Sequence, residues 1–436
     1  MNSPSFLTLF IRTIGSSIAA LLMTIVYSVL SARLLGADGR GTLAAIQLWP
    51  TVLAGSMTVG LQTAFVYYAR QDRSRCAQFF AAGLCATFLV SILSAIVGWR
   101  LLSHALPFLS TAQLHFAKIY LAFMLPVVSV SIYIGGCAQL IEDLRLFNVL
   151  KIVPIAFQVI AIISLYLSVG ITPERLAIGT VVTQLLALSW STREATKSLG
   201  FSLKQTRVHI LMLCGYGASV WAVEVLGVAT QQIDKIWISG ALSLRELGVY
   251  TLAFGMSRVV ANIQNSAATI LFPRNIGKPK GEVVSSTAKV FRLTFWATLV
   301  VAIPASLLAI PLFPLVFGPD FAASGWMFPL LVLECILGTS SWVLAQAFNS
   351  LGKPHLIVTR QISGLLCMVT VAYFLVPRIG VWGVVLAMLT GALVRLVVTL
   401  LAFPKGLKVP MPQIFLDKND IQGVFIILKK KFVSVT

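Results

Sequence analysis

Charged side chains are scarce in this sequence. They account for 11% of its 436 residues, whereas hydrophobic side chains account for 58%. A soluble domain carries about 25% charged residues, and a water-soluble fold of this length cannot hide so much apolar surface. The shortage of charge therefore argues against an ordinary soluble domain and predicts that a lipid bilayer surrounds most of the chain.

Acidic residues are the scarcer of the two signs, with 14 Asp and Glu against 33 Lys and Arg. In a soluble protein this balance would indicate nucleic acid as a partner. In a membrane chain the better explanation is that basic residues gather on the cytoplasmic side, with an anionic substrate as a second cause. We therefore expect membrane lipid as a partner and no nucleic acid.

Patterns that would build a disulfide, metal or nucleotide site are also missing. The six cysteines have no paired spacing, so neither a disulfide framework nor a zinc site is indicated. The four histidines form no HxxxH pair. The glycine clusters "LGADGRG" and "GYGAS" lack the GxxxxGK[ST] pattern and a preceding strand. We expect no metal, no cofactor and no ATP hydrolysis.

Long apolar runs dominate what is present. A run of about 20 apolar residues predicts a membrane-spanning helix, because backbone groups in lipid must pair within their own segment. The runs lie at 10–32, 42–66, 77–102, 116–140, 149–170, 175–192, 211–238, 248–272, 290–316, 326–350, 356–376 and 380–403. The first is too long for the apolar core of a cleaved signal peptide. The predicted fold is an all-α polytopic membrane protein with about 12 transmembrane helices.

The basic residues predict the orientation of these helices. With the N-terminus in the cytoplasm, most lysines and arginines outside the spans fall on the cytoplasmic side, for example Arg70, Arg73 and Arg75. An even number of spans then places both termini in the cytoplasm. The basic tail 404–436 contains "VFIIL" followed by "KKK", which fits either a segment on anionic lipid or a solvated tail.

The second half of the chain repeats residues of the first half at a constant spacing of 207 residues. Gly248 aligns with Gly41, "AQ" at 345–346 aligns with "AQ" at 138–139, and Tyr373 aligns with Tyr166. Each half holds six predicted helices, so the halves keep the same orientation and an axis along the membrane normal relates them. Transporters built in this way bind their substrate between two halves that rock about it.

This duplication predicts the domain organisation. The N-lobe spans 1–195 with helices 1–6, a cytoplasmic linker spans 196–210, and the C-lobe spans 211–403 with helices 7–12. The remaining residues, 404–436, form the cytoplasmic basic tail. The short loops leave no room for a soluble enzyme domain, so we expect a transporter and not an enzyme.

Several stretches resemble a known family. "ARLLGADGRGTLAA" and "GLQTAFVYYAR" look like the first hairpin of the oligosaccharide flippases, which handle O-antigen and exopolysaccharide precursors. "QQIDKIWISGALSLRELGVYTLAFGMSRV" resembles their helix 7–8 junction, and "AQLIEDLRLFNVLKI" resembles the end of their helix 4. These flippases belong to the multidrug/oligosaccharidyl-lipid/polysaccharide exporter superfamily, and the resemblance covers about residues 1–403.

The resemblance implies two six-helix lobes in a V shape. It implies translocation of a polyprenyl-diphosphate-linked oligosaccharide from the cytoplasmic to the outer leaflet of the inner membrane, for surface polysaccharide synthesis. Partners would be that glycan lipid and, further on, the polysaccharide polymerase and chain-length machinery. A cation-coupled multidrug exporter of the same fold is the alternative.

Helix 8 carries the clearest polar stripe of the predicted spans. Thr251, Arg258, Asn262, Asn265 and Thr269 follow helical spacing and would share one face. A lumen-facing stripe would let Arg258 hold a phosphate or sugar hydroxyls and the two asparagines bind a glycan. The competing explanation is a hydrogen-bonded seam between helices.

Helix 7 carries a second polar face, with Glu224, Gln231 and Lys235 spaced by seven and four. Glu224 is deep enough either to bind a coupling proton or to pair with Arg258 or Lys235. Asp234 and Lys235 are expected near the outer end of the helix, where they mark the membrane edge and snorkel to water.

Four further charges fall inside predicted spans. Arg360, Arg395 and Arg12 are candidates for the substrate-binding lumen, although each can also snorkel from a helix end. Glu334 is the second intramembrane acid, either a coupling group or a neutral, hydrogen-bonded carboxyl. Only Glu224 and Glu334 lie deep among the acids, which favours the flippase over a cation-coupled exporter. A membrane glycosyltransferase or polymerase would need a soluble loop or an acidic metal motif, and neither occurs.

Overall fold

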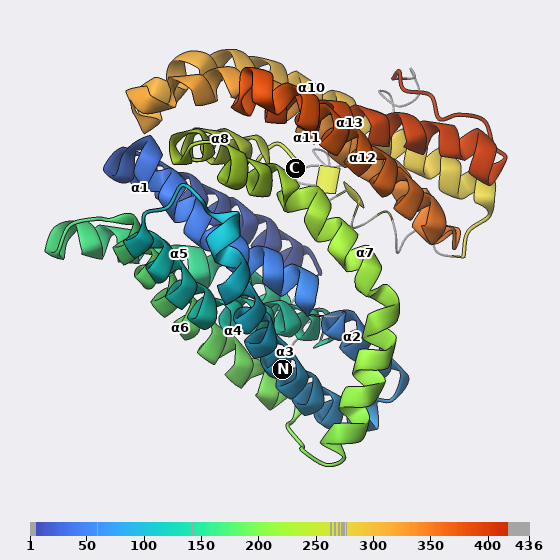
Figure 1. Ribbon diagram of the computed structural model, residues 1–436. Coiled ribbons are helices and arrows are strands. Elements are labelled where there is room, and N and C mark those ends of the chain that lie inside the picture. Colours follow the sequence, from blue (N-terminus) through green and yellow to red (C-terminus); the bar gives the residue numbers. More distant parts are fainter. Residues whose placement is uncertain are drawn as a thin grey trace. The chain divides into compact units, whose positions relative to one another are not determined.

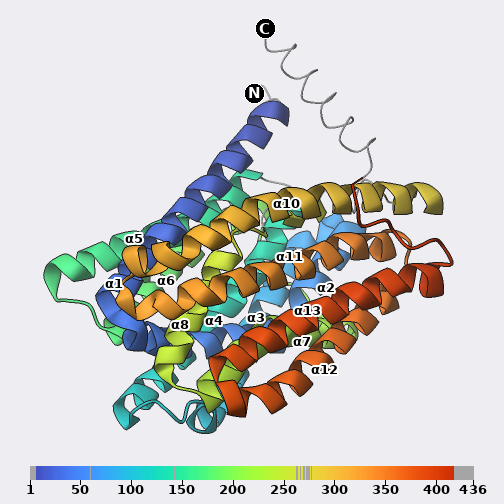
Figure 2. The same cartoon turned by 90° about the horizontal axis from the view of Figure 1, so that it is seen from above.

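The computed structural model describes residues 6–58, 60–141, 144–261, 264–265, 267–268, 271, 275 and 277–416. Within these residues every regular element is a helix (Figure 1, Figure 2). The expected all-α class is confirmed. The "VFIIL" and "KKK" segments of the tail lie outside the described residues.

The chain folds into two compact units, each described by itself. Unit 1 comprises Met1–Leu252 and Val316–Asp320, and unit 2 comprises Ala253–Leu315 and Phe321–Thr436. This division differs from the predicted lobes, because α7 packs on α1, α2 and α3 and so belongs to unit 1. The lobe boundaries at 195 and 211 remain a prediction.

Unit 1 contains the first helices of the chain. They are α1 (Phe6–Met57), α2 (Leu61–Gln71), η1 (Arg73–Arg75), α3 (Cys76–Ala105), α4 (Thr111–Ile141), α5 (Leu144–Ser168), α6 (Pro173–Leu199), α7 (Thr206–Ala241) and the first part of α8 (Leu244–Ser257). Its core lies between α2, α3 and α4, where the rings of Phe65, Phe80 and Tyr133 are buried against one another.

Unit 2 contains the end of α8 and the remaining helices. They are α10 (Lys280–Phe317), η2 (Pro319–Phe321), α11 (Ala322–Ser350), α12 (Pro354–Ile379), α13 (Val381–Ala402) and the π-helical turn η3 (Phe403–Leu407), with the ends of α10 and η2 shared with unit 1. Phe291, Phe348 and Phe403 are buried in its core. Each unit therefore has an apolar centre of its own.

Eight helices among the described residues are long and apolar enough to cross a membrane. Large apolar side chains such as Leu93, Phe123, Leu307 and Leu315 are exposed on them, as expected where the solvent is lipid. The predicted spans at 149–170 and 175–192 form α5 and α6 but are not among the eight. The predicted span at 248–272 is wrong as one helix, because α8 ends at Ser257 and turns follow at 258–261.

The first two predicted spans form a hairpin with almost no loop. Within α1 the backbone is non-helical at Gly36, with φ 66° and ψ −176°, a conformation open mainly to glycine. Arg40 donates through Nη1 to the carbonyl oxygen of Ser28 (2.9 Å) and to Oγ of Ser31 (2.7 Å). A straight helix would separate residues 28 and 40 by about 18 Å, so the chain folds back at Gly36. The predicted loop at 33–41 shrinks to this sharp bend.

Gly41 and Gly248, which occupy equivalent positions in the sequence repeat, lie against each other. A side-chain carbon on Gly41 would lie 1.7 Å from the carbonyl oxygen of Leu244, and one on Gly248 would lie 2.0 Å from the carbonyl oxygen of Ala37. Leu244 follows Ala37 by the same offset as Gly248 follows Gly41. Each half of the contact therefore mirrors the other, as at a two-fold axis.

An ion pair repeats this symmetry. Arg245 lies at the repeat position of Asp38, and its Nη1 is 3.7 Å from an Asp38 carboxylate oxygen. Arg245 also donates to Asp320 at 2.8 Å. All three side chains are largely exposed, so the pairs contribute little stability. Within unit 1 they follow the same symmetry as the glycine contact.

The close contact of Gly41 and Gly248 leads to a testable prediction. Gly41→Ala should destabilise the protein by about 1–3 kcal/mol, because the new methyl group would overlap a backbone carbonyl that cannot move freely. Thermal unfolding of the purified protein measures this. Gly227→Ala in α7 is the control, because no atom lies within 4 Å of the added carbon and alanine favours a helix. Equal unfolding temperatures for both variants would contradict the contact.

Candidate functional site

The start of α2 is held against α7 by a close backbone approach. Gly60 precedes α2 with φ 63°, and a side-chain carbon there would lie 2.7 Å from the carbonyl oxygen of Gly217. Trp221 of α7 donates through its indole N–H to the carbonyl oxygen of Ser56 at 2.6 Å. That carbonyl belongs to the last turn of α1 and has no partner within the helix. The break between α1 and α2 thus fixes both against α7 (Figure 1).

Glu224 lies in this α2–α7 contact. Its carboxylate accepts a hydrogen bond of 2.9 Å from the hydroxyl of Thr63. The side chain of Glu224 is only partly buried. The alternative in which Glu224 pairs with Lys235 or Arg258 stays a prediction. The ion pairs described for those two side chains are with Asp234 and Glu334.

A cavity of about 500 Å³ opens beside Thr63. It is lined by Gln62, Thr63, Val66, Tyr67, Arg70, Gln71 and Tyr216. The rings of Tyr67 and Tyr216 stack with centroids 4.3 Å apart and an interplanar angle of 14°. Sequence reasoning missed this site, because it concentrated on ionisable groups; the amide and aromatic residues of "GLQTAFVYYAR" were the available signal.

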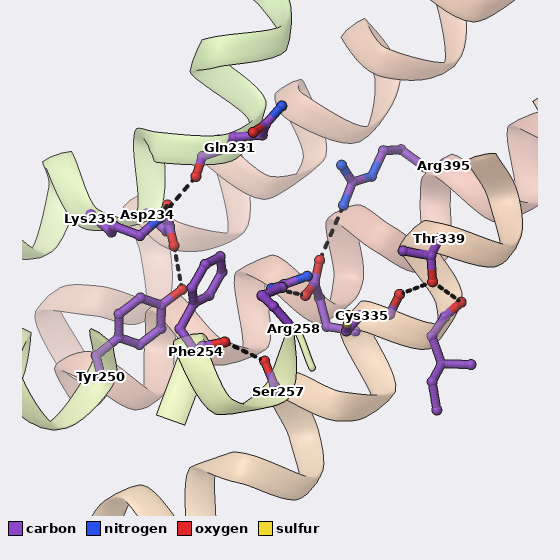
Figure 3. A network of polar contacts seen from close by, with 12 residues as sticks. Gln231, Asp234, Lys235, Tyr250, Phe254, Ser257, Arg258, Cys335, Thr339 and Arg395 are labelled. Carbon is purple, nitrogen blue, oxygen red and sulfur yellow. Dashed lines mark hydrogen bonds and ion pairs between the residues drawn. The ribbon is translucent and has the colours of Figure 1, made fainter. Parts of the chain in front are cut away.

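Asp234 is buried inside the protein. It is 0% exposed; its carboxylate accepts from the hydroxyl of Tyr250 at 2.5 Å and lies 3.6 Å from Nζ of Lys235 (Figure 3). The same ammonium group donates to the carbonyl oxygen of Gln231 and the side chain of Gln232. The expectation that Asp234 snorkels to water is therefore wrong, since Tyr250 from α8 covers it.

Unit 2 holds a cluster of charges around one carboxylate. Glu334 of α11 is 2% exposed and accepts from Nη2 of Arg258 and, at 3.4 Å, from Nη2 of Arg395 (Figure 3). Arg258 lies in the turn after α8, and its guanidinium stacks 4.0 Å above the Phe254 ring. The predicted hydrogen bonding of the Glu334 carboxyl is thus provided by two guanidinium donors.

Arg360 extends the cluster from α12. It is 2% exposed and donates to the hydroxyl of Thr399 at 3.0 Å and to that of Ser341 at 2.5 Å. Arg360 therefore binds hydroxyl groups inside the protein and does not extend to the surface. Arg395 reaches the same region because Gly364 leaves room for it: a side-chain carbon there would lie 2.2 Å from Cγ of Arg395.

The cluster has more positive than negative charge. It contains the guanidinium groups of Arg258, Arg360 and Arg395 and the single carboxylate of Glu334. Nη1 of Arg360 and Nε of Arg395 are buried with no hydrogen-bond acceptor. The arginine side chains also differ in exposure, with 32% for Arg258 and 14% for Arg395. Arg258 is therefore the member most accessible to a ligand.

Of the other predicted site residues, Thr251 and Gln231 belong to unit 1. Thr251 donates to the carbonyl oxygen of Gly248 in its own helix. Gln231 and Asn265 are exposed. Asn262 and Thr269 lie outside the described residues, as does the side chain of Arg12. The continuous helical stripe from 251 to 269 is wrong, because the helix stops before Arg258.

Among the described residues no three Cys, His, Asp or Glu side chains gather as metal ligands would. The polar groups described above instead consist of guanidinium, amide, hydroxyl and paired carboxylate groups. Such groups bind anions and sugar hydroxyls through hydrogen bonds. The chemistry that these side chains offer is thus recognition through hydrogen bonds and charge.

A sequence profile described as "Polysaccharide biosynthesis protein" matches residues 29–324. This range covers more than half of the chain and runs from within α1 to the start of α11. Comparison with curated protein sequences finds no match.

Solved structures share the fold. The lipid II flippase MurJ, in an inward closed conformation, matches with a TM-score of 0.74 and 13% identity over 97% of this chain and 93% of that chain. An inward-facing multidrug resistance MATE family transporter of the MOP superfamily matches with 0.66 and 13% identity over 89% and 94%. The MATE multidrug transporter DinF-BH matches with 0.64 and 16% identity over 91% and 94%. These identities establish the fold alone.

The carboxylate of Glu334, which Arg258 and Arg395 share, leads to a testable prediction. Glu334→Gln should lower the free energy of unfolding by about 3 kcal/mol, because it removes the buried counter-charge of two guanidinium groups. The melting temperature of the purified protein measures this loss. Glu194→Gln is the matched control, since Glu194 pairs with Lys197 on an exposed helix surface, where a pair contributes about 0–1 kcal/mol. A Glu334 variant as stable as the control would refute the pairing.

Proposed function

The chain belongs to the family of polysaccharide biosynthesis proteins, and from this premise we propose that it is a lipid-linked oligosaccharide flippase. It moves a polyprenyl-diphosphate-linked oligosaccharide from the cytoplasmic to the outer leaflet by alternating access. The chain is a multi-pass membrane protein with the fold of known transporters and flippases. Its cargo serves a surface polysaccharide such as O-antigen, exopolysaccharide or capsule.

One observation carries the proposal: three arginines gather in unit 2 with one carboxylate among them. Placing excess positive charge inside an apolar unit is costly, so a protein keeps it where an anion uses it. A diphosphate suits it, because guanidinium groups form forked hydrogen bonds with phosphate oxygens. A cationic drug would instead be repelled.

We assign a different role to each of the three arginines. Arg258 is the most exposed and is the group that contacts the diphosphate. Glu334 holds the guanidinium groups of Arg258 and Arg395 in place from α11. Arg360 is buried beneath hydroxyl acceptors and adds positive potential without contact.

The predicted orientation completes the proposal. Both termini lie in the cytoplasm, and the protein resides in the inner membrane, where the glycan lipid is assembled on the cytoplasmic face. A polysaccharide polymerase and chain-length machinery consume the flipped product. None of these steps requires the chain to act as an enzyme.

A cation-coupled multidrug exporter remains the alternative, since MATE transporters share the fold. Such an exporter needs a carboxylate that a cation can reach. Here Glu224 accepts from Thr63, Asp234 from Tyr250, and Glu334 from two arginines. These partners compete with a cation for each carboxylate and favour the flippase.

A mutation tests the proposal. Deleting the gene should make the cell accumulate lipid-linked sugar, and Arg258→Ala should restore export at least tenfold less well than the natural sequence. The fold should persist, because Glu334 keeps Arg395 as its partner. Labelled surface polysaccharide and the extracted lipid-linked pool measure the effect.

The control is Arg378→Ala, because Arg378 is exposed and donates to the carbonyl oxygen of Phe374 in its own helix. We expect the control to export normally and Glu224→Gln to impair export less than Arg258→Ala. Full export by Arg258→Ala would remove it from the site. Resistance to cationic dyes that depends on the gene, without any change in lipid-linked sugar, would favour the exporter.

A further inference from the structure

We propose that the cavity between α2 and α7 binds a sugar of the lipid-linked glycan. The proposal rests on the flippase function and names a subsite for the glycan within unit 1. The subsite consists of the Tyr67–Tyr216 stack, Gln62, Gln71 and Arg70.

The tyrosine stack supplies an aromatic surface. Stacking on Tyr216 covers one face of the Tyr67 ring, yet Tyr67 remains 41% exposed. Tyr216 and Tyr68 pack on the apolar core of unit 1, whereas Tyr67 does not. The core therefore braces the stack from behind and presents the ring of Tyr67 to the cavity. The C–H faces of a hexopyranose ring pack on such a surface, because the ring is apolar on its face and polar at its edge.

The rest of the lining supplies hydrogen bonds. Gln62 and Gln71 each carry an amide donor and acceptor, Arg70 carries five N–H donors, and Thr63 carries a hydroxyl. A few polar groups around an aromatic wall are the usual composition of a small-ligand site. The volume of about 500 Å³ suits a mono- or disaccharide and not a folded protein segment.

The backbone around the cavity keeps this space open. A side-chain carbon on Gly136 of α4 would lie 2.3 Å from Cγ of Gln62, so only glycine there lets Gln62 take its position. Trp221 and Gly217 fix α7 against the start of α2. Thr63 is oriented by its bond to Glu224, which makes Glu224 a positioning residue of the subsite.

The charges fit a glycan that is loaded from the cytoplasm. Arg70 lies in the last turn of α2, followed by Arg73 and Arg75, which the charge distribution places in the cytoplasm. The glycan lipid is made on that side. The cavity therefore runs along α2 to the end at which the cargo enters in this orientation, and its amides and Arg70 bind sugar hydroxyls there.

The test separates sugar binding from diphosphate binding. The full-length protein in nanodiscs is titrated with farnesyl diphosphate and with the same lipid carrying one N-acetylglucosamine or one glucose. The natural sequence should bind the glycosylated probes about fivefold to tenfold more tightly than farnesyl diphosphate. Tyr67→Leu should abolish that advantage and leave the affinity for farnesyl diphosphate unchanged. Tyr67→Phe should retain most of it, because the ring remains.

A control completes the design. Tyr166→Leu replaces an exposed tyrosine of α5 and should keep the sugar advantage. An equal sugar advantage in Tyr67→Leu and the natural sequence would overturn the subsite, as would no advantage in the natural sequence. Failure of every probe to bind would instead overturn the flippase function itself.

Discussion

The cost of an ionised side chain in apolar surroundings is the constraint on which the rest of the structure depends. The chain places few acids among its apolar helices, and those described above are all bound. Glu334 joins the turn after α8 to α13 through two guanidinium groups, and Asp234 joins α7 to α8 through Tyr250. Since each bond replaces lost hydration, these pairs fix which helices meet. The same pairs leave Arg258 partly exposed.

Much of the fold followed from composition and spacing, because apolar runs of membrane length have one stable secondary structure. The all-α class and the resemblance to the flippases are confirmed. Two equivalent positions of the predicted repeat, Gly41 and Gly248, meet in a contact whose two halves mirror each other. The spacing between the two halves could be recognised in the sequence because a close backbone approach tolerates only glycine. Glycine therefore occurs at the equivalent position of both halves.

The candidate sites were predicted less well, because partners far apart in sequence decide them. Arg258, Arg395, Arg360 and Glu334 were all identified as unusual charges, yet their shared cluster joins four elements whose register no local pattern reveals. Asp234 was assigned to a helix edge because Lys235 follows it, and only the tertiary packing of Tyr250 buries it. The helical stripe at 251–269 failed where the backbone left the helix at Ser257, although no proline marks that point.

The imbalance of charge also bears on how a flippase of this kind would be driven. A diphosphate carries negative charge, and the interior of a respiring cell is electrically negative, so its exit is favoured by about 2.3 kcal/mol per elementary charge for each 100 mV. A coupling cation would need a carboxylate, and at Glu334 it would have to displace two guanidinium groups that the same low dielectric holds in place. Of the two energy sources, the membrane potential is thus the one that does not require the ion pairs among Arg258, Glu334 and Arg395 to break. Under the proposed flippase function, anion binding by the arginines and drive by the membrane potential both follow from this one arrangement of charges.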